Sequence, residues 1–198
     1  MNEIIGELIK REPADILDFA RMTCDVIRAM RQLRKPIISA INGTAAGAGA
    51  VLALASDFRI MADISKFAFL FTKVGLAGSD MGASFLLPRV VGLGRATEML
   101  MLGEPVDAHT AHAVGLCSRV VELAELLPAA REYARRLTEG PALALGVTKE
   151  MLNNTLSASL HDALDEEARA QALCMSMNDF KEFARAFTEK RPAKFTGR

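Results

Sequence analysis

The feature that most constrains this chain is its uncharged run Pro36–Ser56 (PIISAINGTAAGAGAVLALAS). Such a run is long enough to cross a bilayer, which takes about 20 apolar residues. Most of its residues are Ala, Gly, Ser or Thr, however, and Asn42-Gly43 is a turn signal that divides a β-branched part from an alanine-rich part. We therefore interpret the run as a buried strand, a turn and a buried helix, and we keep a membrane span as the less favoured alternative.

Hydrophobic spacing extends this interpretation to the neighbouring segments. Apolar residues recur at helical spacing from about Glu3 to Arg34, and Pro13 fits the first turn of a helix, where its missing N–H is harmless. A strand, a helix and a strand in succession predict a right-handed crossover and a parallel sheet. The predicted strands are Ile37–Ile41, Phe58–Ala62 and Lys66–Phe69, and the predicted helix between the first two is Ala50–Ser56.

The second half of the chain is almost entirely helical in its spacing. The composition changes from mixed α/β to all-α at about Leu123, and Cys117–Val121 is the one further strand candidate. The predicted helices are Ala83–Val91, Arg95–Leu102, His109–Val114, Leu123–Leu137, Leu143–Leu156, Leu160–Ser176 and Phe180–Phe187. The predicted fold class is α/β, followed by a helical region.

Composition excludes several classes of protein. The 198 residues are 51% hydrophobic and 24% charged, which excludes a disordered chain. Lys and Arg total 24, as do Asp and Glu, and a net charge of zero indicates neither a nucleic-acid partner nor a polybasic membrane surface. Cys24, Cys117 and Cys174 form neither a CxxC pair nor a disulfide framework, and the N-terminus lacks a secretory signal. These features predict a cytoplasmic protein.

The glycine-rich segment Gly43–Gly49 lies between a predicted strand and a predicted helix. Backbone N–H groups at such a helix start can face an anion or a polarised carbonyl. The segment lacks the Lys and Ser/Thr of a Walker loop, and its glycines do not have dinucleotide-binding spacing. Close packing of strand and helix, which only small residues allow, is an alternative of similar weight.

Asp80 lies in the loop Gly75–Gly82, among small and apolar residues just before a predicted helix. A carboxylate in apolar surroundings can act as an acid or a base. It can also cap the helix that follows, which is the commoner use of Asp before a helix. The residues alone leave both roles open.

His109 and His112 follow Asp107 at a spacing that some metal sites use. Two histidines without a third ligand fall short of the usual zinc set. We therefore predict no metal site, and we assign Asp107 as a helix N-cap.

Several segments, in order along the chain, form a specific pattern: Lys35–Gly43, Gly47–Gly49, Ala53–Asp57, Ala62, Leu87–Gly92, Gly94–Ala96, Ala111, Gly115-Leu116 and Phe187–Arg191. This pattern resembles the enoyl-CoA hydratase/isomerase family, the crotonases, and covers essentially the whole chain. The resemblance implies a crotonase-like spiral of βα turns, N-terminally incomplete, over residues 1–122. It also implies a helical oligomerisation region over residues 123–198 that builds homotrimers or hexamers.

The resemblance further implies a coenzyme A thioester as substrate and no additional cofactor. In the family, two backbone N–H groups polarise the thioester carbonyl, and the second of them matches Ala48 between Gly47 and Gly49. By the same resemblance, the first belongs to an N-terminal segment that we expect to be missing from this chain. Losing one such donor costs about 100- to 1,000-fold in rate.

The carboxylates of the family are only partly matched. Two glutamates flank the added water in hydratases, and their positions match Val51 and Phe71, which exchange no proton and are expected to line the substrate site. Asp80 matches the functional aspartate of dienoyl-CoA isomerases and 4-chlorobenzoyl-CoA dehalogenase, so catalysis becomes the preferred role over the helix cap. The dehalogenase is less favoured, because Phe71 stands near its tryptophan. Phe187 and Lys190 resemble residues that reach the coenzyme A of a neighbouring subunit, with an exposed charged helix as the alternative.

The sequence thus predicts an acyl-CoA enzyme, a hydratase or an isomerase, with Asp80 as acid/base and the Ala48 N–H in an oxyanion hole. A non-catalytic acyl-CoA-binding or scaffold protein is the alternative, since Val51 and Phe71 replace the carboxylates. An inactive truncated fragment is the third hypothesis. We expect no nucleic-acid or membrane partner.

Overall fold

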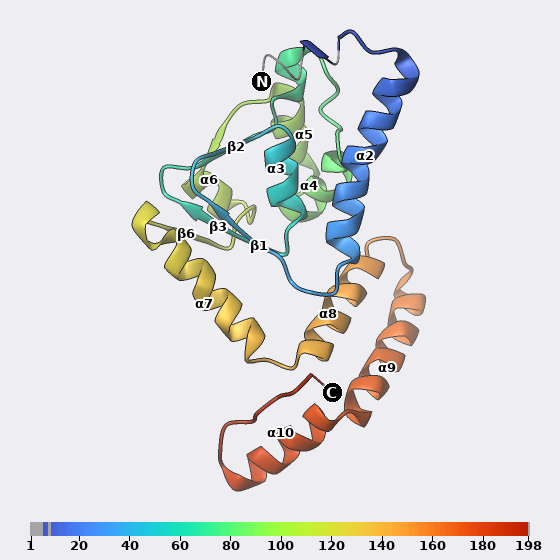
Figure 1. Cartoon of the computed structure of the whole chain (residues 1–198), viewed down its shortest axis with the longest axis vertical. Helices are drawn as coiled ribbons and strands as arrows, with labels where there is room; N and C mark the ends of the chain where they lie inside the picture. Colours follow the sequence, from blue (N-terminus) through green and yellow to red (C-terminus); the bar gives the residue numbers. More distant parts are fainter. Residues whose placement is uncertain (1–5, 8, 198) are drawn as a thin grey trace.

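The computed structural model describes residues 6, 7 and 9–197 (Figure 1). Its strands are β1 (Ile38–Ile41), β2 (Thr44–Ala46), β3 (Phe58–Ala62), β4 (Lys66–Ala68), β5 (Val106–Asp107) and β6 (Arg119–Val121). Its α-helices are α2 (Pro13–Gln32), α3 (Ala48–Ala55), α4 (Ala83–Val91), α5 (Leu93–Leu102), α6 (Ala108–Ala113), α7 (Leu126–Thr138), α8 (Ala142–Asn154), α9 (Leu160–Ser176) and α10 (Asn178–Glu189). The 3₁₀ turns η1 (Leu70–Val74) and η2 (Leu123–Glu125) complete the described elements.

The described strands form two sheets of three, and successive strands alternate between them at first. In one sheet β3 lies between β1 and β6, and all three run parallel, with Ala40 opposite Ile60. In the other sheet β4 pairs in parallel with β2 and antiparallel with β5. Because β1 to β4 belong to the two sheets in turn, each circuit of the chain adds one strand to each sheet. This arrangement is a spiral.

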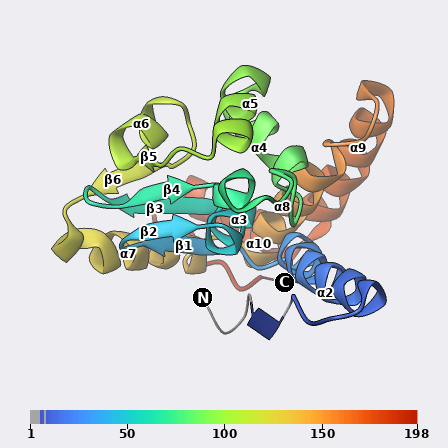
Figure 2. The ribbon, with the colours of Figure 1, turned by 90° about the horizontal axis from the view of Figure 1, so that it is seen from above.

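Helices cover the strands from both sides. Figure 2 shows α6 and α7 on opposite sides of the strands, and α7 packs against β1 and β3. Side chains of β3 alternate between two cores, as the period of a strand requires. Ile60 and Ala62 pack with Leu126 of α7, whereas Met61 lies in the main core.

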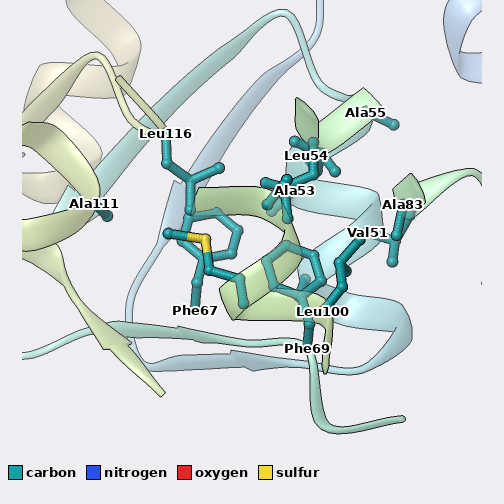
Figure 3. Packing of buried hydrophobic residues seen from close by; sticks show 14 of the residues in the cluster. Val51, Ala53, Leu54, Ala55, Phe67, Phe69, Ala83, Leu100, Ala111 and Leu116 are labelled. Carbon is teal, nitrogen blue, oxygen red and sulfur yellow. The ribbon is translucent and has the colours of Figure 1, made fainter. Parts of the chain in front are cut away.

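The main core lies around α3 and β4. Phe67 and Phe69 are almost completely buried, with nearly parallel rings whose centroids are 6.2 Å apart. Figure 3 shows these rings among Val51 of α3 and Leu100 of α5. Burial of one such aromatic side chain contributes about 1.5–3 kcal/mol, so the pair holds the second sheet against the helices.

The uncharged run folds as predicted except at its centre. Its β-branched part forms β1, its alanine-rich part forms α3, and β1 and β3 pair in parallel. The prediction of a turn throughout Gly43–Gly49 is wrong at Thr44–Ala46, which forms β2. Small residues carry little strand signal of their own, and pairing with β4 makes this segment a strand. No described helix combines the length and apolarity needed to cross a membrane.

Most other predicted elements are confirmed within a few residues. β3, α4 and α9 have the predicted bounds, and β6 lies inside its predicted segment. The predicted helix from Glu3 to Arg34 is interrupted, because residues 9–12 are not helical and α2 begins at Pro13. Residues 3–5 and 8 lie outside the described residues. β5 went unpredicted because two residues are too few to show a period.

The predicted boundary at residue 122 falls between β6 and η2. α7 lies beyond this boundary, yet it packs on the first sheet. Leu126 and Ala129 are buried with Ile60, and the Tyr133 ring meets Phe58 edge-on at 5.7 Å between centroids. α7 therefore contributes to the core, and a division into two domains stays a prediction.

A buried ion pair connects α8 to the start of the spiral. Lys149 Nζ lies 2.7 Å from Asp57 Oδ2 and donates to the carbonyl oxygens of Met30 and Lys35, each at 3.1 Å. The Lys149 side chain is 6% exposed. Asp57 Oδ2 also accepts the N–H of Ile37 at 2.7 Å. The pair thus ties α8 to the segment that leads from α2 into β1.

Replacing Lys149 by methionine is expected to lower the free energy of unfolding by about 3 kcal/mol, because the Asp57 carboxylate loses its buried partner. Urea unfolding followed by circular dichroism measures the change. The matched control is Lys73→Met, since Lys73 and its partner Glu104 are both exposed. That change is expected to cost less than about 1 kcal/mol. Equal costs for the two variants would contradict a special role for the buried pair.

Candidate active site

The glycine-rich segment makes a tight passage from β2 into α3. Gly47 is the N-cap of α3 and has φ +52°, a conformation that glycine adopts far more readily than other residues. Its N–H donates to Ala68 O of β4 at 2.9 Å. Its carbonyl accepts the N–H of Val51 at 3.2 Å, which is the first hydrogen bond of the helix. Gly47 therefore anchors the start of α3 directly to the second sheet.

The N–H groups of Ala48 and Gly49 precede the hydrogen-bond ladder of α3. N–H groups in the first turn of a helix have no acceptor within the helix, and they carry the positive end of its dipole. Both residues are exposed. The position can therefore stabilise an oxygen atom that gains negative charge.

Val51 and Phe71 lie behind this helix start. Val51 is completely buried in α3, and Phe71 in η1 is 7% exposed. The Phe71 Cε1 atom lies 3.9 Å from the position that a Cβ on Gly47 would occupy. Both side chains are apolar, so this wall offers neither a proton donor nor a proton acceptor. Their contact with substrate stays a prediction.

Asp80 is half-buried in the loop between η1 and α4. Its Oδ1 accepts the N–H of Met81 at 2.9 Å, and its backbone carbonyl accepts the N–H of Ala83 at 2.8 Å. The alternative of a side-chain helix cap is wrong. Gly82 is the N-cap of α4, and the described chain provides no side-chain cap at this helix start.

Two successive left-handed residues hold the Asp80 loop in place. Met81 has φ +48° and Gly82 has φ +87°. This conformation costs about 1–2 kcal/mol for a residue with a side chain, so the surroundings must hold Met81 there. The Met81 side chain is 5% exposed and belongs to the main core with Val51. Figure 3 shows Ala83 beside Val51, and the loop is thus fixed against α3.

Helix α10, which contains Phe187 and ends at its C-cap Lys190, lies far from α3 along the molecule (Figure 1). Phe187 is 77% exposed, and its ring centroid lies 6.0 Å from that of Phe183 on the same helix. Lys190 is the C-cap of α10, with φ +53°. One chain does not bring these two residues to Ala48, so their contact with coenzyme A requires a second copy and stays a prediction.

Asp179 of α10 holds the end of the described tail. Its side chain is nearly buried, at 7% exposure. Its Oδ1 accepts the N–H of Thr196 at 2.7 Å, and its Oδ2 accepts the N–H of Gly197 at 2.9 Å. The chain after α10 therefore returns along the helix.

Glu182, one turn along the helix, holds the middle of the tail. Its Oε1 accepts from Arg191 Nη1 at 2.6 Å and from the N–H of Lys194 at 3.0 Å. The Arg191 hydrogen bond, followed by that from Lys194, lowers the pKa of Glu182 from 4.5 to about 2. These contacts fix the turn that contains Lys190.

Acidification is expected to release this tail. The folded pKa of Glu182 lies below its unfolded value, so its contribution is complete above about pH 4.5 and is lost as the pH falls toward 2. Hydrogen exchange measures this as lost protection of the Lys194 N–H. The Glu182→Gln variant is expected to show that loss already at neutral pH, whereas Glu132→Gln, in an exposed pair on α7, leaves it unchanged. Full protection in the Glu182 variant would contradict the assignment.

The histidine pair stands apart from this site. Within the described residues, no group of three or more His, Cys, Asp or Glu side chains could hold a metal ion. Asp107 caps α6 as predicted, accepting the N–H of Thr110 at 2.9 Å and its hydroxyl at 2.8 Å. The backbone hydrogen bond from Thr110 is the main cause of the lowered pKa of Asp107.

Comparison with known proteins identifies the family. A sequence model described as enoyl-CoA hydratase/isomerase matches residues 5–198. The chain belongs to the enoyl-CoA hydratase/isomerase family. This membership confirms the resemblance seen in the sequence and places the chain among the hydratase/isomerase-type enzymes.

Individual relatives agree with this assignment. The chain is 40% identical over 173 residues to the 1,2-epoxyphenylacetyl-CoA isomerase of Escherichia coli, covering 87% of this chain and 66% of that protein. It is 34% identical to the trans-2-decenoyl-[acyl-carrier-protein] isomerase of Streptococcus mutans, covering 98% and 76%. A crystal structure from Streptomyces coelicolor A3(2), provisionally named an enoyl-CoA hydratase, has a TM-score of 0.97 and 53% identity, covering 100% and 72%.

These matches confirm a crotonase-like α/β fold with a helical C-terminal region. The chain spans 66% of the length of the E. coli isomerase and 72% of the S. coelicolor protein. The predictions of a missing N-terminal segment and of an oligomerisation role for the helices stay predictions.

Sequence analysis missed one polar feature away from the candidate site. Asp57 and Arg59 are charged residues within the otherwise apolar stretch 50–62, and that isolation is the signal that could have revealed them. The structure half-buries both, near the opposite end of α3 from Ala48. Both residues line a cavity.

Proposed function

We propose that this chain is an acyl-CoA enzyme of the isomerase type. In this proposal the Ala48 N–H, flanked by Gly47 and Gly49, polarises the thioester carbonyl, and Asp80 transfers the proton. One observation carries the choice: the Asp80 carboxylate accepts the N–H of Met81, whose buried side chain shares the main core with Val51 of α3, whereas the two residues that match the hydratase glutamates, Val51 and Phe71, are apolar.

The proposed reaction moves a double bond without adding atoms. The Asp80 carboxylate takes a proton from C2 of a 3-enoyl thioester, and the C–H electrons form an enolate. The Ala48 N–H stabilises the negative charge on the thioester oxygen. The enolate then collapses, a double bond forms between C2 and C3, and C4 receives the proton from Asp80. One carboxylate suffices, because it takes up a proton in the first step and gives one back in the second, and the half-buried acid exchanges its proton with water between the two steps.

Two relatives named as isomerases support an isomerisation of a thioester, and one of them is named for an enoyl group. One relative is named for a coenzyme A thioester and the other for an acyl-carrier-protein thioester. The thioester carbonyl is therefore the feature that the two named substrates share. Hydration would require a group to activate water, and neither Val51 nor Phe71 can do so. We assign coenzyme A as the carrier and no further cofactor.

A second copy is proposed to complete the substrate site. Leu160, Leu164 and Phe187 expose 76%, 56% and 77% of their surface on α9 and α10, and burial against another chain would stabilise them. Phe187 can stack on an adenine ring, and Lys190 can pair with a phosphate. A homotrimer or hexamer is the proposed assembly, and light scattering measures it.

A non-catalytic acyl-CoA-binding protein is the second candidate. The same apolar pair, Val51 and Phe71, favours it, because the family glutamates are absent from those positions. It predicts saturable binding of an acyl-CoA with no turnover.

Absorbance of the conjugated enoyl thioester tests the proposal and separates the candidates. With 3-hexenoyl-CoA, isomerisation creates the conjugated chromophore, and the signal is expected to rise. With crotonyl-CoA, hydration removes the chromophore and would lower the signal. Loss of signal with crotonyl-CoA alone would contradict the isomerase proposal, and saturable binding without change in either assay would favour the non-catalytic candidate.

A further inference from the structure

A cavity lies at the opposite end of α3 from Ala48. It has a volume of about 420 Å³ and is bounded by β3, α4, α7 and α8, with the end of α2 at its edge (elements in Figure 1). α3 has eight residues, so its two ends are about 12 Å apart. This cavity is therefore separate from the proposed oxyanion site.

The cavity wall carries more positive than negative charge. Arg31, Arg59, Arg89 and Lys149 line it, against the single carboxylate of Asp57. That carboxylate is already engaged by Lys149 at 2.7 Å, and it lies 3.6 Å from Arg31 Nη1. Among the described residues, no carboxylate lies within 4.0 Å of Arg59 or Arg89. The wall thus has cationic groups that the described residues do not neutralise.

In the described part of the chain, the hydrogen bonds of the Arg59 side chain all go to backbone carbonyl groups. Its Nε donates to Leu116 O at 2.6 Å, and its Nη1 donates to Leu54 O at 3.2 Å and Ser56 O at 2.5 Å. Burial, and next the charge of Arg31, hold the pKa of Arg59 below its ordinary value. These carbonyls belong partly to the end of α3, whose dipole offsets some of the charge. A full counter-charge is still missing from the described residues.

Two other guanidinium groups have hydrogen-bonding capacity to spare. Arg31 Nε is buried and has no hydrogen-bond partner among the described residues, whereas Arg31 Nη1 donates to Ala55 O at 3.2 Å and Nη2 donates to Asn153 Oδ1. Arg89 is exposed, with its Cζ 3.6 Å from the centroid of the Phe85 ring and its Nη1 bonded to Phe85 O at 2.8 Å. A guanidinium has five N–H donors, so most of those on Arg89 remain for another acceptor.

The rest of the cavity wall is mainly apolar. Aliphatic side chains of three helices face the same space as the guanidinium groups, among them Leu86, Val90, Leu137, Leu145 and Leu152. Such a wall favours an apolar body over a strongly hydrated ion. The occupant that fits both parts has one anionic end and one apolar end.

We propose that this cavity binds a small organic carboxylate whose carboxylate group is attached to an apolar chain or ring. The carboxylate would lie against Arg89, because a guanidinium fork matches two carboxylate oxygens. The apolar part would lie against α4 and α8. Binding at this place joins the spiral core to α8 and is separate from thioester chemistry at Ala48.

Calorimetric titration of the full chain with three probes tests the proposal. Octanoate has both features, octanol has the apolar chain without the charge, and inorganic phosphate has charge without an apolar body. Saturable binding of octanoate is expected, at least tenfold tighter than that of octanol or phosphate. Arg89→Gln is expected to weaken octanoate binding about tenfold, and Arg89→Lys to weaken it less, because the charge remains but the fork is lost.

Arg95→Gln is the matched control, since Arg95 is an exposed arginine on α5 and pairs with Glu98 away from the cavity. It is expected to leave octanoate binding unchanged. The proposal is overturned if octanoate does not bind, if octanol or phosphate binds as tightly, or if Arg89→Gln has no effect. If octanoate binds only at the thioester site, its affinity will be the same for the wild-type chain and for Arg89→Gln.

Discussion

Replacing Asp80 by asparagine is expected to lower kcat for 3-enoyl-CoA isomerisation by about 1,000-fold. Asparagine keeps the size of the side chain and can still accept the Met81 N–H, but it cannot take up and return a proton. KM is expected to change less than about threefold, since the proton is transferred only in the chemical step. Steady-state kinetics on the 3-enoyl-CoA substrate measure both constants.

Asp63 provides the matched control for Asp80. Its Oδ1 also accepts the N–H of the next residue, Ile64, at 2.9 Å, but it lies in an exposed turn after β3. Asp63→Asn is expected to leave kcat unchanged. If Asp80→Asn retains wild-type turnover, or if both variants lose it alike, Asp80 is not the proton-transfer group.

Replacing Ala48 by proline is expected to lower kcat by roughly 100- to 1,000-fold, or about 2.7–4 kcal/mol, through loss of one oxyanion donor. The first position of a helix tolerates proline, because its N–H has no acceptor within the helix. Gly47, which would precede the new proline, has φ +52° and ψ −122°. These angles are the mirror image of the extended conformation that residues before proline prefer, and glycine adopts both forms because it has no side chain. The fold is therefore expected to persist, and the kinetic constants isolate the lost N–H.

Leu93→Pro is the matched control for this variant. Leu93 is the first residue of α5, is exposed, and follows Gly92, which has φ +80°. Proline there removes an N–H at the start of α5 instead of α3. Turnover is therefore expected to stay at the wild-type level. Unchanged turnover in Ala48→Pro would remove this N–H from the proposed mechanism.

Much of the fold was predictable because its signals are local. The β-branched and apolar run Phe58–Ala62 matches β3, and the helical spacing of Leu160–Ser176 matches α9. β2 was not predictable, because Thr44–Ala46 becomes a strand only by pairing with Lys66–Ala68. Its structure comes from a partner more than twenty residues away in the sequence rather than from its own residues.

The candidate site was predictable to a smaller extent. The start of α3 follows from the glycines, since Gly47 needs a positive φ there. The position of Asp80 depends on Met81, which has a left-handed backbone conformation and a buried side chain. No sequence pattern predicts that conformation. The Asp57–Lys149 pair is harder still, because its partners are separated by 92 residues and meet only through tertiary packing.

Deuterium transfer tests the central claim, that Asp80 moves a proton at the acyl chain, most directly. The full chain and its Asp80→Asn variant are incubated with a 3-enoyl-CoA in deuterated water, and mass spectrometry follows deuterium at C2 and C4 over many turnovers. The account predicts deuterium in the conjugated product of the wild-type chain and none above the uncatalysed background with the variant. Equal deuterium incorporation by the two proteins would contradict it.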